Sequence, residues 1–202
     1  MTNPADSVNI NRSVSESEPN IHTTKLIISA VNSVQAIVST TDSSQVTADP
    51  RAELDSHANI AVLRKYTYIF ESTGKTCNVK PFMDDLGMVT DIPVVDGALA
   101  YDCPYTRETR ILIIHNALCI KSMETNLIPP FIMRKGGIIV SDVPKIHCSD
   151  PSKDDHCITF STCNLHIPLQ LIGIFSYFHT RKPLSQELIG KDKIFITPDS
   201  SN

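Results

Sequence analysis

Residues 51–60 read RAELDSHANI, and this stretch decides how the rest of the chain is interpreted. Asp55 follows an apolar residue, Leu54, that can bury the end of a strand. The hydroxyl of Ser56 can fix the geometry of a neighbouring carboxylate by hydrogen bonding, and the small residue Ala58 lets the chain turn closely. This setting suits a catalytic aspartate on a strand-to-loop bend. On these residues alone, an ordinary Asp-Ser turn after a strand is the simpler interpretation.

The composition limits the classes of protein to which the chain can belong. Its 202 residues include 22 acidic and 18 basic side chains, for a formal net charge of −4. This balance argues against a nucleic-acid coat and a polybasic membrane anchor, and no apolar run approaches the ~20 residues of a membrane-spanning helix. The first residues, MTNPADSVNINRS, lack the basic and apolar regions of a signal peptide. We therefore expect an intracellular, cytoplasmic protein whose six cysteines are free thiols.

The character of the sequence divides the chain into three parts. Residues 1–50 are rich in Ser and Thr and predict a disordered or weakly ordered segment and linker, although residues 24–38 fit either a helix or a strand. Residues 51–184 contain short runs of Ile and Val separated by turn residues, which predict one mostly β domain. Residues 185–202 lose apolar density and predict a flexible tail. The single helix expected is short, near Asn126–Lys135, with two prolines in its first turn and two glycines at its end.

The segment DSHAN resembles the D-S-G-A active-site motif of retropepsins, in the D-S-H-A-D form of copia-like retrotransposon Gag-Pol polyproteins. Three later blocks resemble the same family in the same order, so that the resemblance runs from Glu53 to Pro183. They are residues 79–103 (VKPFMDDLGMVTDIPVVDGALAYDC), residues 111–140 (ILIIHNALCIKSMETNLIPPFIMRKGGIIV) and residues 165–183 (LHIPLQLIGIFSYFHTRKP).

The resemblance implies a fold, a function and a set of site residues. The fold would be a retropepsin-like closed barrel, one lobe of an acid protease, with one short helix over residues 51–184. The function would be that of an aspartic endopeptidase that cleaves its own polyprotein, with no metal or organic cofactor. Asp55 would be the catalytic residue, and Ser56, His57 and Ala58 would support the active-site loop.

Catalysis by this route requires two aspartates, because two carboxyl groups ~3 Å apart share one proton and can act as acid and base together. The chain has a single motif of this kind and is too short for two lobes. We therefore expect a homodimer in which Asp55 of each copy faces the other across a two-fold axis. The partners expected are this second copy and a peptide or polyprotein substrate, without nucleic acid or membrane.

Two residues depart from the pattern of the family. Position 57 is His where most retropepsins have Gly, and position 59 is Asn where this branch more often has Asp. The ring of His57 could disturb proton sharing, or it could be an exposed loop side chain without a chemical role. These departures keep an alternative open, in which the chain is a catalytically inactive retropepsin-like dimerisation or interaction module, or a decayed retroelement fragment.

Retropepsins close a hairpin, the flap, over the substrate. The segment between Lys80 and Asp91 is the best candidate, and its residues Asp85, Leu86 and Gly87 are predicted to bind substrate. A plain surface loop is the alternative. His115 lies in an apolar run and is expected to be a core or edge histidine, and the basic residues near Arg181 are expected to form a solvated end.

Several Cys and His residues gather late in the sequence and raise the possibility of a zinc-binding regulatory protein. Only Cys163 and His166 have the close spacing that zinc ligands commonly show, and His166 also belongs to a block that resembles the protease. We therefore expect no metal site. The residues concerned are His147, Cys148, His156, Cys157, Cys163 and His166.

Overall fold

A computed structural model describes residues 50–64, 66–79 and 88–198, and within them the protein is mostly β, as predicted. The strands are β1 (Arg51–Leu54), β2 (Val62–Leu63), β3 (Tyr68–Val79), β4 (Val89–Asp102), β5 (Thr109–Cys119), β6 (Asn126–Ile128), β7 (Ile139–Ser141), β8 (Cys157–Phe160), β9 (Leu165–Pro168), β10 (Gln170–Ile172), β11 (Phe175–His179) and β12 (Lys193–Phe195). The helices are α1 (Pro130–Lys135), α2 (Ser185–Gly190) and the 3-10 turn η2 (Lys145–His147). The predictions for residues 1–49 and 199–202 lie outside the described residues.

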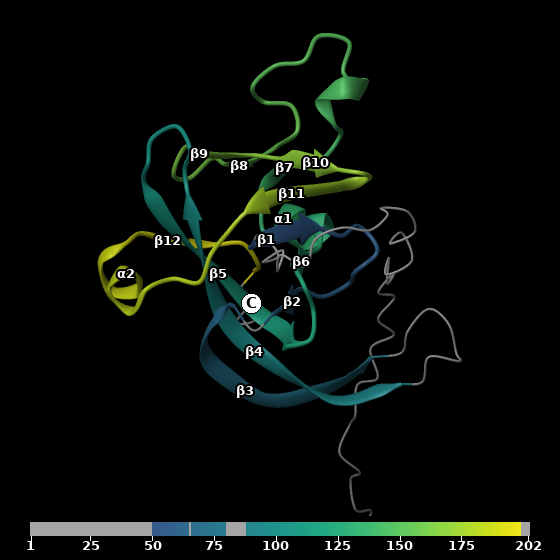
Figure 1. The fold of residues 1–202 in the computed structure, drawn as a ribbon, viewed down its shortest axis with the longest axis vertical. Helices are drawn as coiled ribbons and strands as arrows, with labels where there is room; N and C mark the ends of the chain where they lie inside the picture. The colour runs from purple at the N-terminus through teal and green to yellow at the C-terminus, as the bar shows by residue number, and fades with distance from the viewer. Residues whose placement is uncertain (1–49, 65, 80–87, 199–202) are drawn as a thin grey trace, which may run out of the picture.

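The described strands form two sheets (Figure 1). The larger has nine strands in the order β10-β11-β1-β6-β2-β5-β4-β3, with β12 also paired to β5, and the smaller has the order β7-β8-β9. The long hairpin of β3 and β4 curves below the rest of the larger sheet (Figure 1). Because β3 pairs only with β4, the path of described strands ends at β3 and β10. The expected closed barrel is therefore not observed among these strands.

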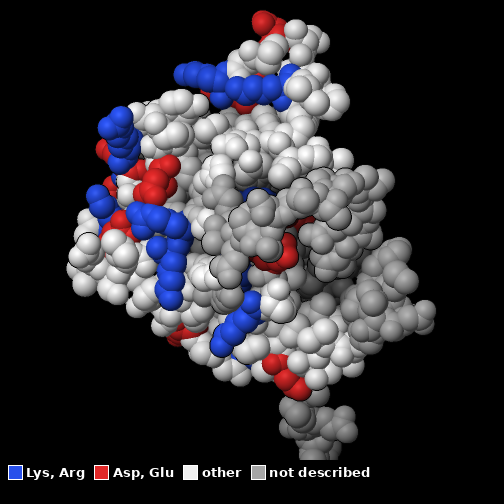
Figure 2. Space-filling view, viewed as in Figure 1, with Lys and Arg blue, Asp and Glu red and all other residues white. Residues whose placement is uncertain are grey.

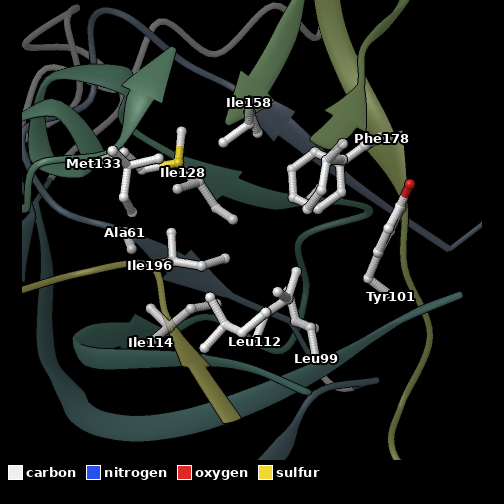
Figure 3. Close-up of a cluster of buried hydrophobic side chains, with 14 of the residues drawn as sticks. Ala61, Leu99, Tyr101, Leu112, Ile114, Ile128, Met133, Ile158, Phe178 and Ile196 are labelled. Carbon is white, nitrogen blue, oxygen red and sulfur yellow. The ribbon is translucent and has the colours of Figure 1, made fainter. Parts of the chain in front are cut away.

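The core lies between the two sheets and is centred on β5. The run of residues 111–114 is fully buried because β5 lies inside the sheet and is covered on both faces, which explains its continuous apolar sequence. Ile158 of the smaller sheet and Phe178 of the larger one point toward each other in this core (Figure 3). Burial of such side chains is the main favourable term in folding.

The short helix is confirmed in part. α1 has Pro130 at its first position and ends at Lys135, directly before Gly136, so that its end agrees with the prediction. The first residues of the predicted helix, Asn126–Ile128, instead form strand β6, because they pair with β1 on one side and β2 on the other. A pairing between distant segments has overridden a local helical pattern.

The end of the chain differs from the expected flexible tail. Residues from Ser185 form α2, and β12 then pairs in parallel with β5, with Lys193 opposite Ile111. Ile194 and Ile196 are buried in the main core. The apolar density looked low because β12 presents only alternate residues to the core. No helix of the described residues is long and apolar enough to cross a membrane.

Candidate active site

The loop that carries Asp55 is positioned by three short strands. β6 lies between β1 and β2, parallel to β1 and antiparallel to β2. Because β1 and β2 follow each other in the chain, the loop of residues 55–61 must cross the end of β6. Asp55 is the first residue of this loop, and its backbone N–H donates to the carbonyl of Ile128, the last residue of β6 (3.2 Å). The pairing of β6 therefore sets where Asp55 lies.

The carboxylate of Asp55 has few partners in the described part of the chain. One oxygen, Oδ1, accepts a hydrogen bond from the backbone N–H of His57 (2.9 Å), and the His57 ring nitrogen Nδ1 lies 3.9 Å from the same oxygen. The Asp55 side chain is 14% exposed, so it is sheltered and yet reachable. A carboxylate in this position retains an oxygen that can accept a proton or bind water.

The other residues of the predicted active-site loop, Ser56, His57 and Ala58, differ in burial and in contacts. Ala58 is buried, in keeping with a close turn. The hydroxyl of Ser56 lies 3.4 Å from Nδ1 of His57, so its described contact is with the imidazole and not with the Asp55 carboxylate. The His57 side chain is exposed. The role of Ser56 in supporting the active-site loop stays a prediction.

The sequence analysis missed Asn126, which lies at the end of β6 opposite the Asp55 loop and fixes the strands that carry it. Its buried side-chain oxygen accepts hydrogen bonds from the backbone N–H of Arg64 (3.0 Å) and from the hydroxyl of Thr67 (2.9 Å). Its amide nitrogen lies 3.5 Å from the carbonyl of Arg51. Asn126 thus joins the start of β1 to the chain that leaves β2. In the sequence, a polar residue directly before the apolar run LIPP could have drawn attention to Asn126. Its role, however, follows only from the pairing of β6 with β1 and β2.

The flap prediction cannot be placed in this geometry. Asp85, Leu86 and Gly87 lie outside the described residues, between the hairpin strands β3 and β4. The hairpin pairing reaches Val79 opposite Val89. The substrate-binding role of the segment stays a prediction.

A second group of carboxylates lies at the far end of β4, and we call it the Arg181 cluster. Arg181 donates hydrogen bonds to Asp102 (2.6 and 2.9 Å) and to Glu187 (2.8 and 2.7 Å). These bonds lower the pKa of both carboxyl groups, that of Glu187 to about 2. Basic and acidic side chains adjoin on this side of the molecule, around α2 (Figure 2). The expected solvated end is therefore an ion-pair network.

His115 forms a further carboxylate pair. Its Nδ1 lies 2.8 Å from Oδ2 of Asp96, whose other oxygen accepts the backbone N–H of Asn116 (2.8 Å). The ring stacks on Phe195 with centroids 5.6 Å apart. The pair ties β4, β5 and β12 together, in agreement with a core or edge histidine.

The late Cys and His residues do not gather around a common point. Among residues that the structure describes, no group of three or more His, Cys, Asp or Glu could hold a metal ion. His156 is buried, and its Nε2 lies 2.8 Å from the hydroxyl of Ser176. Cys163 is exposed, and its sulfur lies 3.9 Å from the carbonyl of Phe160. The described cysteines are all free thiols.

Comparisons with known proteins identify no relative: no protein-family model, curated protein or solved structure matches the chain. A family for the chain is therefore a proposal. Its support is the DSHAN segment, the order of the later blocks and the geometry of the loop around Asp55.

Proposed function

We propose that the chain is a retropepsin-type aspartic endopeptidase of copia-like retrotransposon origin, which cleaves its polyprotein as a homodimer. The observation that carries the proposal is the position of Asp55. It begins a loop that crosses the end of β6, and its sheltered carboxylate accepts a single hydrogen bond from the described residues. A structural aspartate at a strand end normally has its oxygens satisfied by a cap or a cation, as buried polar groups usually are.

The proposed chemistry uses one Asp55 from each of two copies. Two carboxyl groups ~3 Å apart cannot both ionise, so they hold one proton between them. The ionised carboxylate takes a proton from a water, whose oxygen attacks the scissile carbonyl carbon. The protonated carboxyl gives its proton to the carbonyl oxygen, and the resulting diol collapses as the departing amine is protonated.

The position of His57 favours a second candidate, a catalytically inactive dimerisation or interaction module. Its Nδ1 lies 3.9 Å from the Asp55 carboxylate. The imidazole lies beside the carboxylate that would have to share a proton with the second copy, and it can interfere with that sharing. The same fold and the same dimer would then exist without hydrolysis.

Cleavage of an unfolded test protein separates the two candidates. The full chain, Asp55→Asn and the control Asp150→Asn are incubated with a reduced and alkylated protein between about pH 4 and pH 7, where shared-proton carboxyl pairs work. Peptide products are measured by mass spectrometry. Because Asp150 is exposed and distant in sequence, its variant should cleave as the unmodified chain does.

We expect Asp55→Asn to lower the rate by about 10³-fold or more, the scale of a lost acid–base group. Equal cleavage by Asp55→Asn contradicts the endopeptidase. Absence of cleavage from the unmodified chain, together with cleavage by His57→Gly, supports the second candidate.

A further inference from the structure

The β10–β11 hairpin reaches the edge of the sheet where Asp55 lies. β11 pairs antiparallel to β1, with Arg51 opposite His179 and Glu53 opposite Tyr177. This register carries Asp55 toward Phe175, the first residue of β11. Since Ile172 pairs with Phe175, the turn formed by Gly173 and Ile174 lies beyond them. Figure 1 shows this turn on the same side of the molecule as the loop after β1.

The tip of this hairpin is apolar and exposed, which the fold itself does not require. Gly173 has a φ of 60°, which allows the two-residue turn. Ile174 is 82% exposed and Ile172 is 46% exposed, so these side chains contribute little to the core. The second position of such a turn has no need of a large apolar residue, and polar residues are usual in turns.

A third exposed apolar residue lies at the same edge on the other side of the loop. β6 runs parallel to β1, so α1, which follows β6, begins where β1 ends. Phe131 of α1 is 47% exposed. We name Phe131, Ile172 and Ile174 the Asp55 edge patch, because they flank the Asp55 loop along the sheet order β10-β11-β1-β6.

We propose that the Asp55 edge patch is the contact surface for a second copy of this chain, with Ile174 as its central residue. The inference rests on the proposed function, because an aspartic site built from one Asp55 is incomplete without that copy. A two-fold axis at Asp55 brings the surfaces beside it onto the same surfaces of the other copy. Residues 167–178 contain no acidic or basic side chain, so like charges of the hairpin do not meet across the axis.

Equilibrium sedimentation of full-length chains tests the proposal. All chains carry Asp55→Asn, so that association is read without cleavage and independently of whether the site is active. The test variant is Ile174→Asp. The matched control is Ile189→Asp, since Ile189 is an isoleucine of similar exposure (90%) in α2, on the opposite side of the molecule. Circular dichroism checks folding, and Ile174→Thr replaces Ile174→Asp if the latter fails to fold.

The expected result is a dimer whose dissociation constant rises at least about tenfold with Ile174→Asp and is unchanged with Ile189→Asp. A monomer at all concentrations, an unchanged constant for Ile174→Asp, or equal shifts for both variants overturns the contact. Normal dimerisation of Ile174→Asp with a raised KM of the active chain also overturns it and assigns the patch to substrate. Dimerisation as expected without cleavage by the active chain leaves the contact standing and rejects the endopeptidase.

Discussion

The Asp55 loop and the Arg181 cluster each place a carboxylate at the end of a strand, but they supply it with very different partners. Arg181 donates paired hydrogen bonds to both Asp102 and Glu187. The carboxylate of Asp55 accepts one backbone hydrogen bond from the described residues, and the nearest ring nitrogen lies 3.9 Å away. One site satisfies its carboxylates, whereas the described residues give the Asp55 carboxylate a single hydrogen bond.

This difference teaches how to separate structural from reactive carboxylates in one chain. In the Arg181 cluster the hydrogen bonds from Arg181 are the main reason that the pKa of Glu187 is lowered to about 2. This carboxyl group therefore stays ionised in mild acid. A carboxylate held in that way cannot exchange protons with a substrate. The strands that carry the Asp55 loop are instead joined by neutral groups, since Asn126 of β6 accepts hydrogen bonds from Arg64 and Thr67 after β2.

The largest effect on stability is expected from Asn126→Leu. The substitution leaves the backbone N–H of Arg64 and the hydroxyl of Thr67 buried without their acceptor, at a cost of about 2–3 kcal/mol. Thr67→Val removes a single donor and should cost about 1 kcal/mol. Urea unfolding measures both values. An Asn126→Leu midpoint equal to that of the unmodified chain would show that these two buried donors do not depend on this side chain.

Arg181→Met should cause the next largest loss of stability, about 1–2 kcal/mol. The loss is limited because Arg181 and Asp102 are partly exposed and water screens their interaction.

The same variant should change the dependence of stability on pH. The folded pKa of Glu187 is lowered from its ordinary value of 4.5 to about 2. Its contribution is therefore present above the ordinary value and is lost as the pH falls toward 2. Arg181→Met should flatten this acid-side loss in urea unfolding from pH 2 to pH 7. The control is Arg134→Met, which breaks the more exposed pair with Asp142; equal losses from both variants would contradict the prediction.

A smaller pH effect is expected from His156, whose pKa is lowered by burial and then by Lys145, against the opposing effect of Asp142. As the pH falls below the ordinary value of 6.5, the unfolded chain binds a proton before the folded chain does, so stability decreases. His156→Asn removes the titration while tolerating the positive φ of 52° at this position. Thermal unfolding between pH 5 and pH 8 should show a shallower slope for the variant. An unchanged slope would exclude His156 as its source.

The smallest effect on stability is expected from Asp55→Asn, below about 0.5 kcal/mol, because an amide oxygen can still accept the N–H of His57. Glu187→Gln is the same chemical change in the Arg181 cluster and should cost about 1 kcal/mol, since it removes a charge that Arg181 binds. Urea unfolding of the two variants compares the sites directly. A larger loss of unfolding free energy for Asp55→Asn than for Glu187→Gln would contradict the view that the Arg181 cluster, and not the Asp55 loop, depends on its carboxylate for stability.

Local patterns were sufficient for much of the fold. The Ile- and Val-rich runs predict strands, and most of them are strands, because their side chains fill a core on one face or both. The end of α1 was readable from Gly136, which acts on the backbone within one turn. The position of Asp55 directly after a strand was readable for the same reason.

Other features depend on segments that are distant in sequence and could not be read locally. Asn126–Ile128 continues into a helical pattern, and only its pairing with β1 and β2 makes it a strand. Arg181 looked like a solvated basic residue, because Asp102 is far from it in sequence and Glu187 belonged to an expected tail. The open path of the larger sheet likewise follows from β3 pairing on one side only.

The sequence by itself determined that this chain is a mostly β protein, that Asp55 follows a strand, and that small residues surround it. These properties follow from side-chain size, backbone preference and apolar spacing over a few residues. Only the tertiary structure decided that the loop crosses the end of β6, that Asn126 joins the start of β1 to the chain after β2, and that the apolar hairpin tip lies at the same edge as the loop. The reason is physical: strand pairing joins residues far apart in the chain, so a carboxylate's partners, or their absence, are set by the fold and not by its neighbours in sequence.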